Sequence, residues 1–137
     1  MISILPQLIV SGILIGGIYA LLSIGLTLIF GVLRIVNFAQ GEFIMLAMFG
    51  AFWLYQLWGI DPYLSIFVVA PVIFVLGLMT ERVVIKPILH APHAMQIFAT
   101  FGISVILQNL ALTLWGPDYR SIQTAYATQS FIVGNVA

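Results

Sequence analysis

Four long apolar segments, separated by short polar breaks, dominate the pattern of this chain. They cover residues 8–30, 43–60, 63–80 and 94–115. A helix that crosses a bilayer needs about 20 predominantly apolar residues, with a lower limit near 17. The first and fourth segments exceed this length comfortably, while the second and third lie near the lower limit. The pattern therefore predicts an all-α fold, a polytopic transmembrane helical bundle with about four spanning helices. The predicted helices cover approximately residues 8–33, 43–60, 63–80 and 94–115.

The composition indicates that the solvent around this bundle is lipid. Of 137 residues, 63% are hydrophobic and 6% are charged, and the mean hydropathy is +1.21. A soluble domain has about 25% charged residues, which cover its surface. We therefore expect residues 1–137 to form a single transmembrane domain in contact with membrane lipid. The formal net charge of zero argues against a nucleic-acid partner, because binding to phosphates requires clustered Lys and Arg.

The basic residues predict the orientation of the helices. Short cytoplasmic loops carry an excess of Lys and Arg. The connection 81–93 contains Arg82 and Lys86, whereas the turn near residue 60 contains only Asp61. We therefore place the 81–93 loop in the cytoplasm, and the Asp61 turn and the N-terminus outside. Arg34 then falls on the cytoplasmic side, in agreement with the rule.

Small and hydroxylated side chains form one stripe along the first predicted helix. The stripe consists of Gly12, Gly16, Ala20, Ser23, Thr27 and Gly31, which fall within roughly 100° at the angular spacing of an α-helix. Small residues let membrane helices approach closely, so the stripe is predicted to be a packing face. The alternative is that Ser23 and Thr27 line a polar path. Packing is favoured, because both hydroxyls can also bond to the backbone of their own helix.

The segment 34–42, RIVNFAQGE, interrupts the apolar pattern. Arg34 and Glu42 are the only two charged side chains in the first sixty residues, and they bracket Asn37 and Gln40. One interpretation is a cytoplasmic turn, with Glu42 starting the next helix near its positive dipole end. The other is a break at membrane depth, which is tolerated where backbone is buried in protein or lines a cavity, as in transporters. Composition alone narrowly favours the turn. The break makes Asn37, Gln40 and Glu42 candidates for a translocation pathway.

Two amides lie in the middle of the fourth apolar segment. Gln108 and Asn109 would cost free energy at that depth unless they are hydrogen-bonded. We therefore predict that they hold helices together, with substrate contact as the lesser alternative.

The chain carries no pattern typical of an enzyme. It has no cysteine for a thiolate site and no glycine-rich phosphate loop with its lysine. His90 and His93 flank Pro92 without a nearby carboxylate or thiol, which favours loop histidines over metal ligands. We therefore expect no catalytic residue, metal or cofactor, and no enzymatic activity.

Two long runs resemble a known family. They are GLTLIFGVLRIVNFAQGEFIMLAMFGAF at 25–52 and ERVVIKPILHAPHAMQIFATFGISVILQNLALTLWGPDYRSI at 81–122. Both are similar to the inner-membrane permease subunits of branched-chain amino acid ABC transporters, a family that also includes permeases for urea and short amides. In these permeases the segment 34–42 belongs to a helix-breaking region near the translocation path. The resemblance therefore gives the break in the membrane equal standing with the cytoplasmic turn.

The resemblance implies a function and a set of partners. The chain would be a permease subunit, in a bacterial inner membrane, that imports leucine-, isoleucine- or valine-like amino acids. Its partners would be a second homologous permease subunit, two cytoplasmic ATPase subunits and an extracytoplasmic solute-binding protein. Family members are about twice as long, so we expect a fragment or a truncated reading frame that lacks the ATPase-docking helix. The alternatives are a permease for urea or short amides, a passive channel or secondary carrier, and a membrane subunit without a pathway.

Overall fold

The computed structural model describes residues 4–124, and every regular element within this range is helical. The elements are α1 (Ile4–Leu33), α2 (Gln40–Trp58), α3 (Pro62–Thr80), the π-helical turn η1 (Glu81–Ile85), α4 (Lys86–Ile88) and α5 (His93–Trp115). This confirms the predicted all-α bundle class. The described chain divides into two units, residues 4–28 with 123–124 and residues 29–122.

Helix α1 is apolar along its length and provides most of the described part of the first unit. Its side chains of leucine and isoleucine are largely exposed, as suits a helix whose neighbours are lipid or other membrane helices. The helix ends at Leu33, where the Arg34 amide donates to the Phe30 carbonyl at 2.8 Å. Arg34 adopts a left-handed conformation with φ of 55°. This conformation usually belongs to a glycine after a helix.

Helices α2 and α3 form an antiparallel hairpin with a tightly specified turn. Gly59 ends α2 in the left-handed region, with φ of 65°, and its amide donates to the Tyr55 carbonyl at 2.9 Å. The Asp61 carboxylate then accepts a bond from the Tyr63 amide at 2.9 Å, and Pro62 is the first residue of α3. A glycine after one helix, followed by an acidic cap and proline at the start of the next, is the favoured chemistry for such a turn.

Small residues allow α2 and α3 to approach closely. A Cβ added to Gly50 of α2 would lie 3.4 Å from a methyl carbon of Val69 in α3. Ser65 of α3 is almost completely buried, and its hydroxyl donates to the Pro62 carbonyl at 2.6 Å. Close backbone approach is the main source of attraction between helices in lipid, so Gly50 and Ser65 help to hold the hairpin together.

The prediction that residues 81–93 form a loop is wrong for its first eight residues. Helix α3 continues without interruption through η1 and α4 to Ile88, so the connection to α5 consists only of residues 89–92. The Lys86 amide bonds to the Glu81 carbonyl, five residues earlier. Charges and a proline made this stretch resemble a loop. Pro87 has no amide hydrogen and clashes with a regular α-helical turn, and a π-turn is one way in which a helix accommodates an extra residue.

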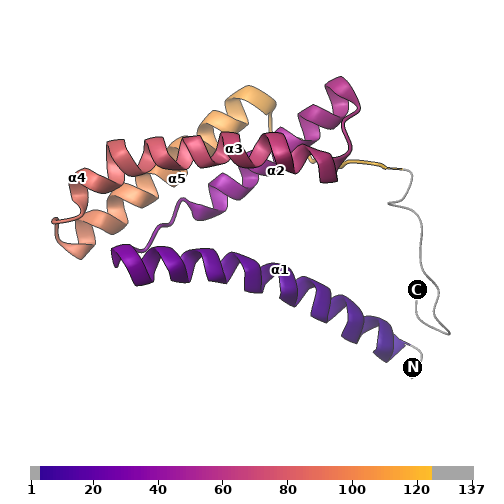
Figure 1. The fold of residues 1–137 in the computed structure, drawn as a ribbon, viewed down its shortest axis with the longest axis horizontal. Coiled ribbons are helices and arrows are strands. Elements are labelled where there is room, and N and C mark those ends of the chain that lie inside the picture. Colours follow the sequence, from indigo (N-terminus) through magenta and orange to yellow (C-terminus); the bar gives the residue numbers. More distant parts are fainter. Residues whose placement is uncertain (1–3, 125–137) are drawn as a thin grey trace. The chain divides into compact units, whose positions relative to one another are not determined.

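Helix α5 reverses the direction of α3, packs beside α2 and completes the second unit (Figure 1). Phe49 of α2 stacks on Trp115 of α5, with ring centroids 4.6 Å apart, and Ala111 is buried. After α5, the Arg120 guanidinium lies over the rings of Phe52 and Trp53 at 5.6 and 5.3 Å. Aromatic stacking and cation–π contact therefore join the ends of α2 and α5.

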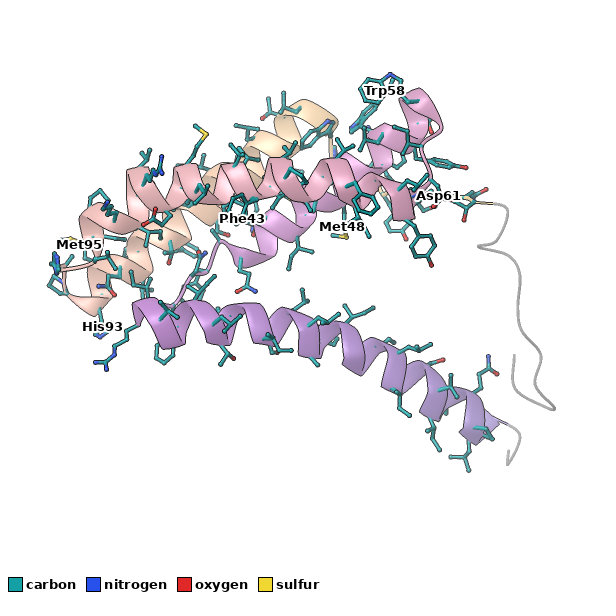
Figure 2. The ribbon with its side chains drawn as sticks, viewed as in Figure 1. Phe43, Met48, Trp58, Asp61, His93 and Met95 are labelled. Atoms are coloured by element: carbon teal, nitrogen blue, oxygen red, sulfur yellow. The ribbon has the colours of Figure 1, made fainter. Side chains whose placement is uncertain are left out.

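Three stretches of the described chain are long and apolar enough to cross a membrane. They are Leu5–Val32, Pro62–Ile88 and His93–Trp115. Helix α2 is not among them, and it carries Gln40 and Glu42 in its first turn. In the second unit Trp58 and Asp61 lie at one end, and His93 and Met95 lie at the other (Figure 2). The chain is a multi-pass membrane protein whose second helix begins with polar side chains.

Candidate functional site

The break between α1 and α2 is packed into the second unit. It consists of residues 34–39. Ile35 is 1% exposed and Ala39 is completely buried, whereas a solvated turn would expose both. Apolar side chains on this short segment therefore anchor it among the helices.

Asn37 shapes the start of α2. Its Oδ1 accepts a hydrogen bond from the Ala39 amide at 3.0 Å, which is the geometry of an Asx turn. The Asn37 carbonyl also accepts from the Gln40 amide at 3.4 Å. The oxygen of the Asn37 side chain is therefore used locally, and its Nδ2 group takes no part in these bonds.

Thr100 joins the break to α5. It is completely buried, and its hydroxyl lies 3.1 Å from both the Val36 carbonyl and the Ile97 carbonyl. Thr100 comes seven residues after His93, the first residue of α5. At 1.5 Å per residue, the break therefore lies about 10 Å along α5 from its start.

A polar cluster joins α2 to α5 one turn further along. The Ser104 hydroxyl and the Gln108 Nε2 donate to the same carboxylate oxygen of Glu42, at 2.9 and 2.6 Å. Ser104 is 6% exposed. Residues four apart share a helix face, so Ser104 and Gln108 form one two-donor surface for Glu42. The structure thus brings together two residues, Glu42 and Gln108, that the sequence singled out separately.

A cleft of about 320 Å³ opens beside the break, between its residues and the far end of α3. Its lining residues are Ile29, Ile35, Asn37, Gln40, Phe43, Gly77, Thr80, Glu81 and Ile85. Two candidates for the pathway, Asn37 and Gln40, therefore share one wall. The half-buried Glu81 of the π-turn faces the same space, and sequence reasoning had assigned it no role in a site.

Other residues predicted from the sequence bond within their own helix. The hydroxyls of Ser23 and Thr27 donate to the Tyr19 and Ser23 carbonyls at 2.8 and 2.7 Å. The Asn109 amide likewise donates to the Val105 carbonyl at 2.7 Å. These bonds satisfy the donors without a second helix. The pathway role of Ser23 and Thr27 and the interhelical role of Asn109 stay predictions, as does the packing role of the glycine stripe.

Gln96 is a structural residue that sequence reasoning missed. Its Nε2 lies 3.2, 3.1 and 3.1 Å from the carbonyls of Ile88, Leu89 and Ala91, and the side chain is 6% exposed. The last carbonyls of a helix have no partner within it. Gln96 therefore caps the end of α4 and fixes the turn into α5. The sequence signal for this cap was an amide side chain in the first helical turn after a proline.

Two of the basic residues assigned to the cytoplasmic side lie on the helical extension of α3. Arg82 and Lys86 are exposed on η1 and α4.

Across residues 4–124, the structure shows no group of three His, Asp or Glu side chains that could hold a metal ion.

The family is established by comparison with known proteins. Residues 8–134 match the model of the branched-chain amino acid transport system / permease component family. The chain belongs to this family.

Relatives of this permease chain come from bacteria and an archaeon. It is 30% identical over 126 residues to the high-affinity branched-chain amino acid transport system permease protein BraD of Pseudomonas aeruginosa, covering 86% of this chain and 41% of BraD. It is 31% identical over 136 residues to the permease protein LivH of Salmonella typhimurium, covering 91% of this chain and 43% of LivH. A probable LivH of Methanocaldococcus jannaschii is 36% identical over 92 residues, covering 64% of this chain and 28% of that protein. The chain thus spans about two fifths of the length of its curated bacterial relatives. No solved structure matches it.

Proposed function

We propose that this chain forms part of the translocation pathway in the permease subunit of an ATP-driven importer for branched-chain amino acids. The residues 34–42 form an intramembrane break in this pathway. Its neighbours in the bundle, α3 and α5, hold the break in place. The substrate class follows from the names of BraD and LivH, which are branched-chain amino acid transport permeases.

The observation that carries the proposal is the burial of the break beside α5. Thr100 bonds to the Val36 carbonyl, about 10 Å along α5 by the rise of an α-helix. A bilayer core is about 30 Å thick, so the break would lie roughly a third of the way across if α5 begins at the interface. Irregular backbone at such depth is tolerated where it is buried in protein or lines a cavity, and the cleft beside Asn37 provides a cavity.

The proposed partners are those that the family resemblance implies. This chain would pair with a second permease subunit, in a bacterial inner membrane, to enclose the path. Two cytoplasmic ATPases would hydrolyse ATP, and an extracytoplasmic binding protein would deliver the amino acid. The chemistry of the chain itself is conformational, because a transporter alternates the side to which its binding site opens.

Uptake by the complete transporter tests this proposal. The permease containing this chain is reconstituted with its partners in proteoliposomes, and ATP-dependent uptake of radiolabelled leucine is measured. Asn37→Asp keeps the oxygen that starts α2 but removes the amide donor, and Gln40→Ala removes the second amide. We expect each variant to lower uptake by about tenfold or more, as for a lost hydrogen bond to a charged ligand. Gln56→Ala, an exposed amide at the opposite end of α2, should leave uptake unchanged.

The rival functions predict different results. A passive channel or secondary carrier would move leucine in vesicles without ATPase subunits, whereas the proposal requires them. A subunit without a pathway would tolerate both amide substitutions at normal assembly. Either result would contradict the proposal.

A further inference from the structure

The cleft beside the break combines three kinds of surface. Its lining contains a carboxylate from Glu81, amides from Asn37 and Gln40, and apolar side chains from Ile35, Phe43 and Ile85. Two other cavities of the second unit, on either side of the α2–α3 contact, are lined almost entirely by apolar residues. Those suit lipid tails. Ligand sites are typically apolar cavities of roughly 300 to 1,000 Å³ with a few placed polar groups, and this cleft fits that description.

Glu81 lies in the cleft without a compensating cation. It is half-buried, and the described residues that line the cleft include no Lys or Arg. Its basic neighbours Arg82 and Lys86 are exposed. A carboxylate in a membrane segment is costly to bury, and such residues commonly mark ligand or ion paths. A cationic group in the cleft would offset this cost.

The break supplies a hydrogen-bond donor to the cleft lining. Asn37 commits its Oδ1 to the Ala39 amide, so its Nδ2 is the group available to a ligand in the cleft. An amide nitrogen donates to carboxylates, and a hydrogen bond to a charged group is stronger than a neutral one. The cleft thus has an acceptor for a cation on η1 and a donor for an anion on the break.

A π-turn begins at Glu81. The Lys86 amide bonds to the Glu81 carbonyl five residues earlier, so η1 takes one residue more than a regular α-helical turn. Such an insertion shifts the helical register, so the side chains after it lie on a different face relative to those before it than in a regular α-helix. π-Turns are frequent at functional sites.

We propose that this cleft is a binding site for a small aliphatic α-amino acid in its zwitterionic form. The ammonium group binds the Glu81 carboxylate, the carboxylate accepts from the Asn37 amide, and the aliphatic side chain packs against Ile35, Phe43 and Ile85. This inference rests on the proposed function and specifies where the substrate is held and which groups recognise it.

The kinetics of three variants test the role of Glu81. In reconstituted, ATP-dependent leucine uptake, Glu81→Gln should raise KM by roughly tenfold or more, because it removes a charged hydrogen-bond partner. It should leave kcat nearly unchanged, since an interaction made equally in the bound and moving states affects KM alone. Glu81→Asp should restore most of the affinity. Arg82→Gln, a matched loss of one charge on the same π-turn but outside the cleft lining, should behave as the parent protein.

Thiol labelling in the purified permease tests the site without transport. The chain has no cysteine, and Thr80 lines the cleft while donating its hydroxyl to its own helix. With this chain's only thiol at Thr80→Cys, leucine should slow maleimide labelling several-fold. 4-Methylpentanoate, which lacks the ammonium group, should not slow it. Protection should also be lost when Glu81→Gln is added.

The two experiments separate failure of the site from failure of the function. If the parent transporter moves no leucine with ATP, the proposed function is wrong. If it transports leucine but Glu81→Gln leaves KM unchanged, or leucine does not protect Thr80→Cys, this site is overturned while the function stands. Should Glu81→Gln fail to assemble, protection of Thr80→Cys in the presence of native Glu81 still decides.

Discussion

A single residue, Arg34, ends α1 in a conformation that disfavours any side chain. Its φ of 55° places it in the left-handed region, where a residue with a Cβ costs roughly 1–2 kcal/mol relative to glycine. Its amide still bonds to the Phe30 carbonyl, so the helix end is satisfied despite this cost. The positive charge that is predicted to lie on the cytoplasmic side therefore occupies a position at which glycine would be the more stable choice.

Replacement of Arg34 by glycine and by alanine measures this strain. Both variants remove the same charge, but only Arg34→Gly removes the Cβ. We expect the glycine variant to exceed the alanine variant in free energy of unfolding by about 1 kcal/mol, measured by denaturation of the complete permease in detergent. Equal stabilities would mean that the left-handed conformation is absent in the membrane protein.

Polar side chains that stand out in an apolar segment could be identified from the sequence, while the roles assigned to them stay predictions. Glu42, Asn37 and Gln108 were noticed because charges and amides are rare in this chain, and the structure places all three at contacts of the break or of α5. Glu81 was given no role in a site. Its place in the cleft depends on how the break packs beside the end of α3, which the local sequence does not reveal.

At the scale of elements, hydropathy predicted the existence of the helices better than their ends. The second helix was predicted to start at residue 43, whereas α2 starts at Gln40. Hydropathy missed the first turn of α2 because that turn is polar. The extension of α3 to Ile88 was missed because Arg82, Lys86 and Pro87 are typical of a loop. Tertiary contact supplies what the local sequence lacks, since Gln96 satisfies the carbonyls at the end of α4.

The hydroxyl of Thr100 is expected to hold the break against α5. Thr100→Val preserves the shape but leaves the partly buried Val36 carbonyl without this donor, which should lower the free energy of unfolding by about 1–3 kcal/mol. Thr100→Ser keeps the donor and should lose less. When Asn37→Cys is added to each variant, its thiol should be labelled faster in the Thr100→Val protein than in the Thr100→Ser protein. Identical labelling rates would show that this bond does not restrain the break.

At the scale of the whole molecule, the second unit has two chemically different ends. Trp58 and Asp61 lie at one end and His93 at the other (Figure 2), and the basic Lys86 of α4 lies on the helix that leads to the His93 end. Tryptophan favours membrane interfaces, and Lys and Arg favour the cytoplasmic side. This difference between the two ends does not depend on whether residues 81–88 form a loop or a helix. We therefore retain the proposal that the Asp61 turn is outside and residues 89–92 are cytoplasmic.

Labelling from each side of the membrane tests this topology and the depth of the break together. In the complete permease, with single thiols introduced into this cysteine-free chain, an impermeant maleimide added outside should label Ile60→Cys and not His90→Cys. In inside-out vesicles the order should reverse, because the two positions flank opposite ends of α3 and its extension. Asn37→Cys should react slowly with the bulky reagent from either side and faster with a small methanethiosulfonate, since Ile35 and Ala39 beside it are buried. Rapid labelling of Asn37→Cys by the bulky reagent in inside-out vesicles alone would instead identify residues 34–42 as a turn exposed to the cytoplasm. In that case the break could not line an intramembrane path, whatever the substrate of the transporter.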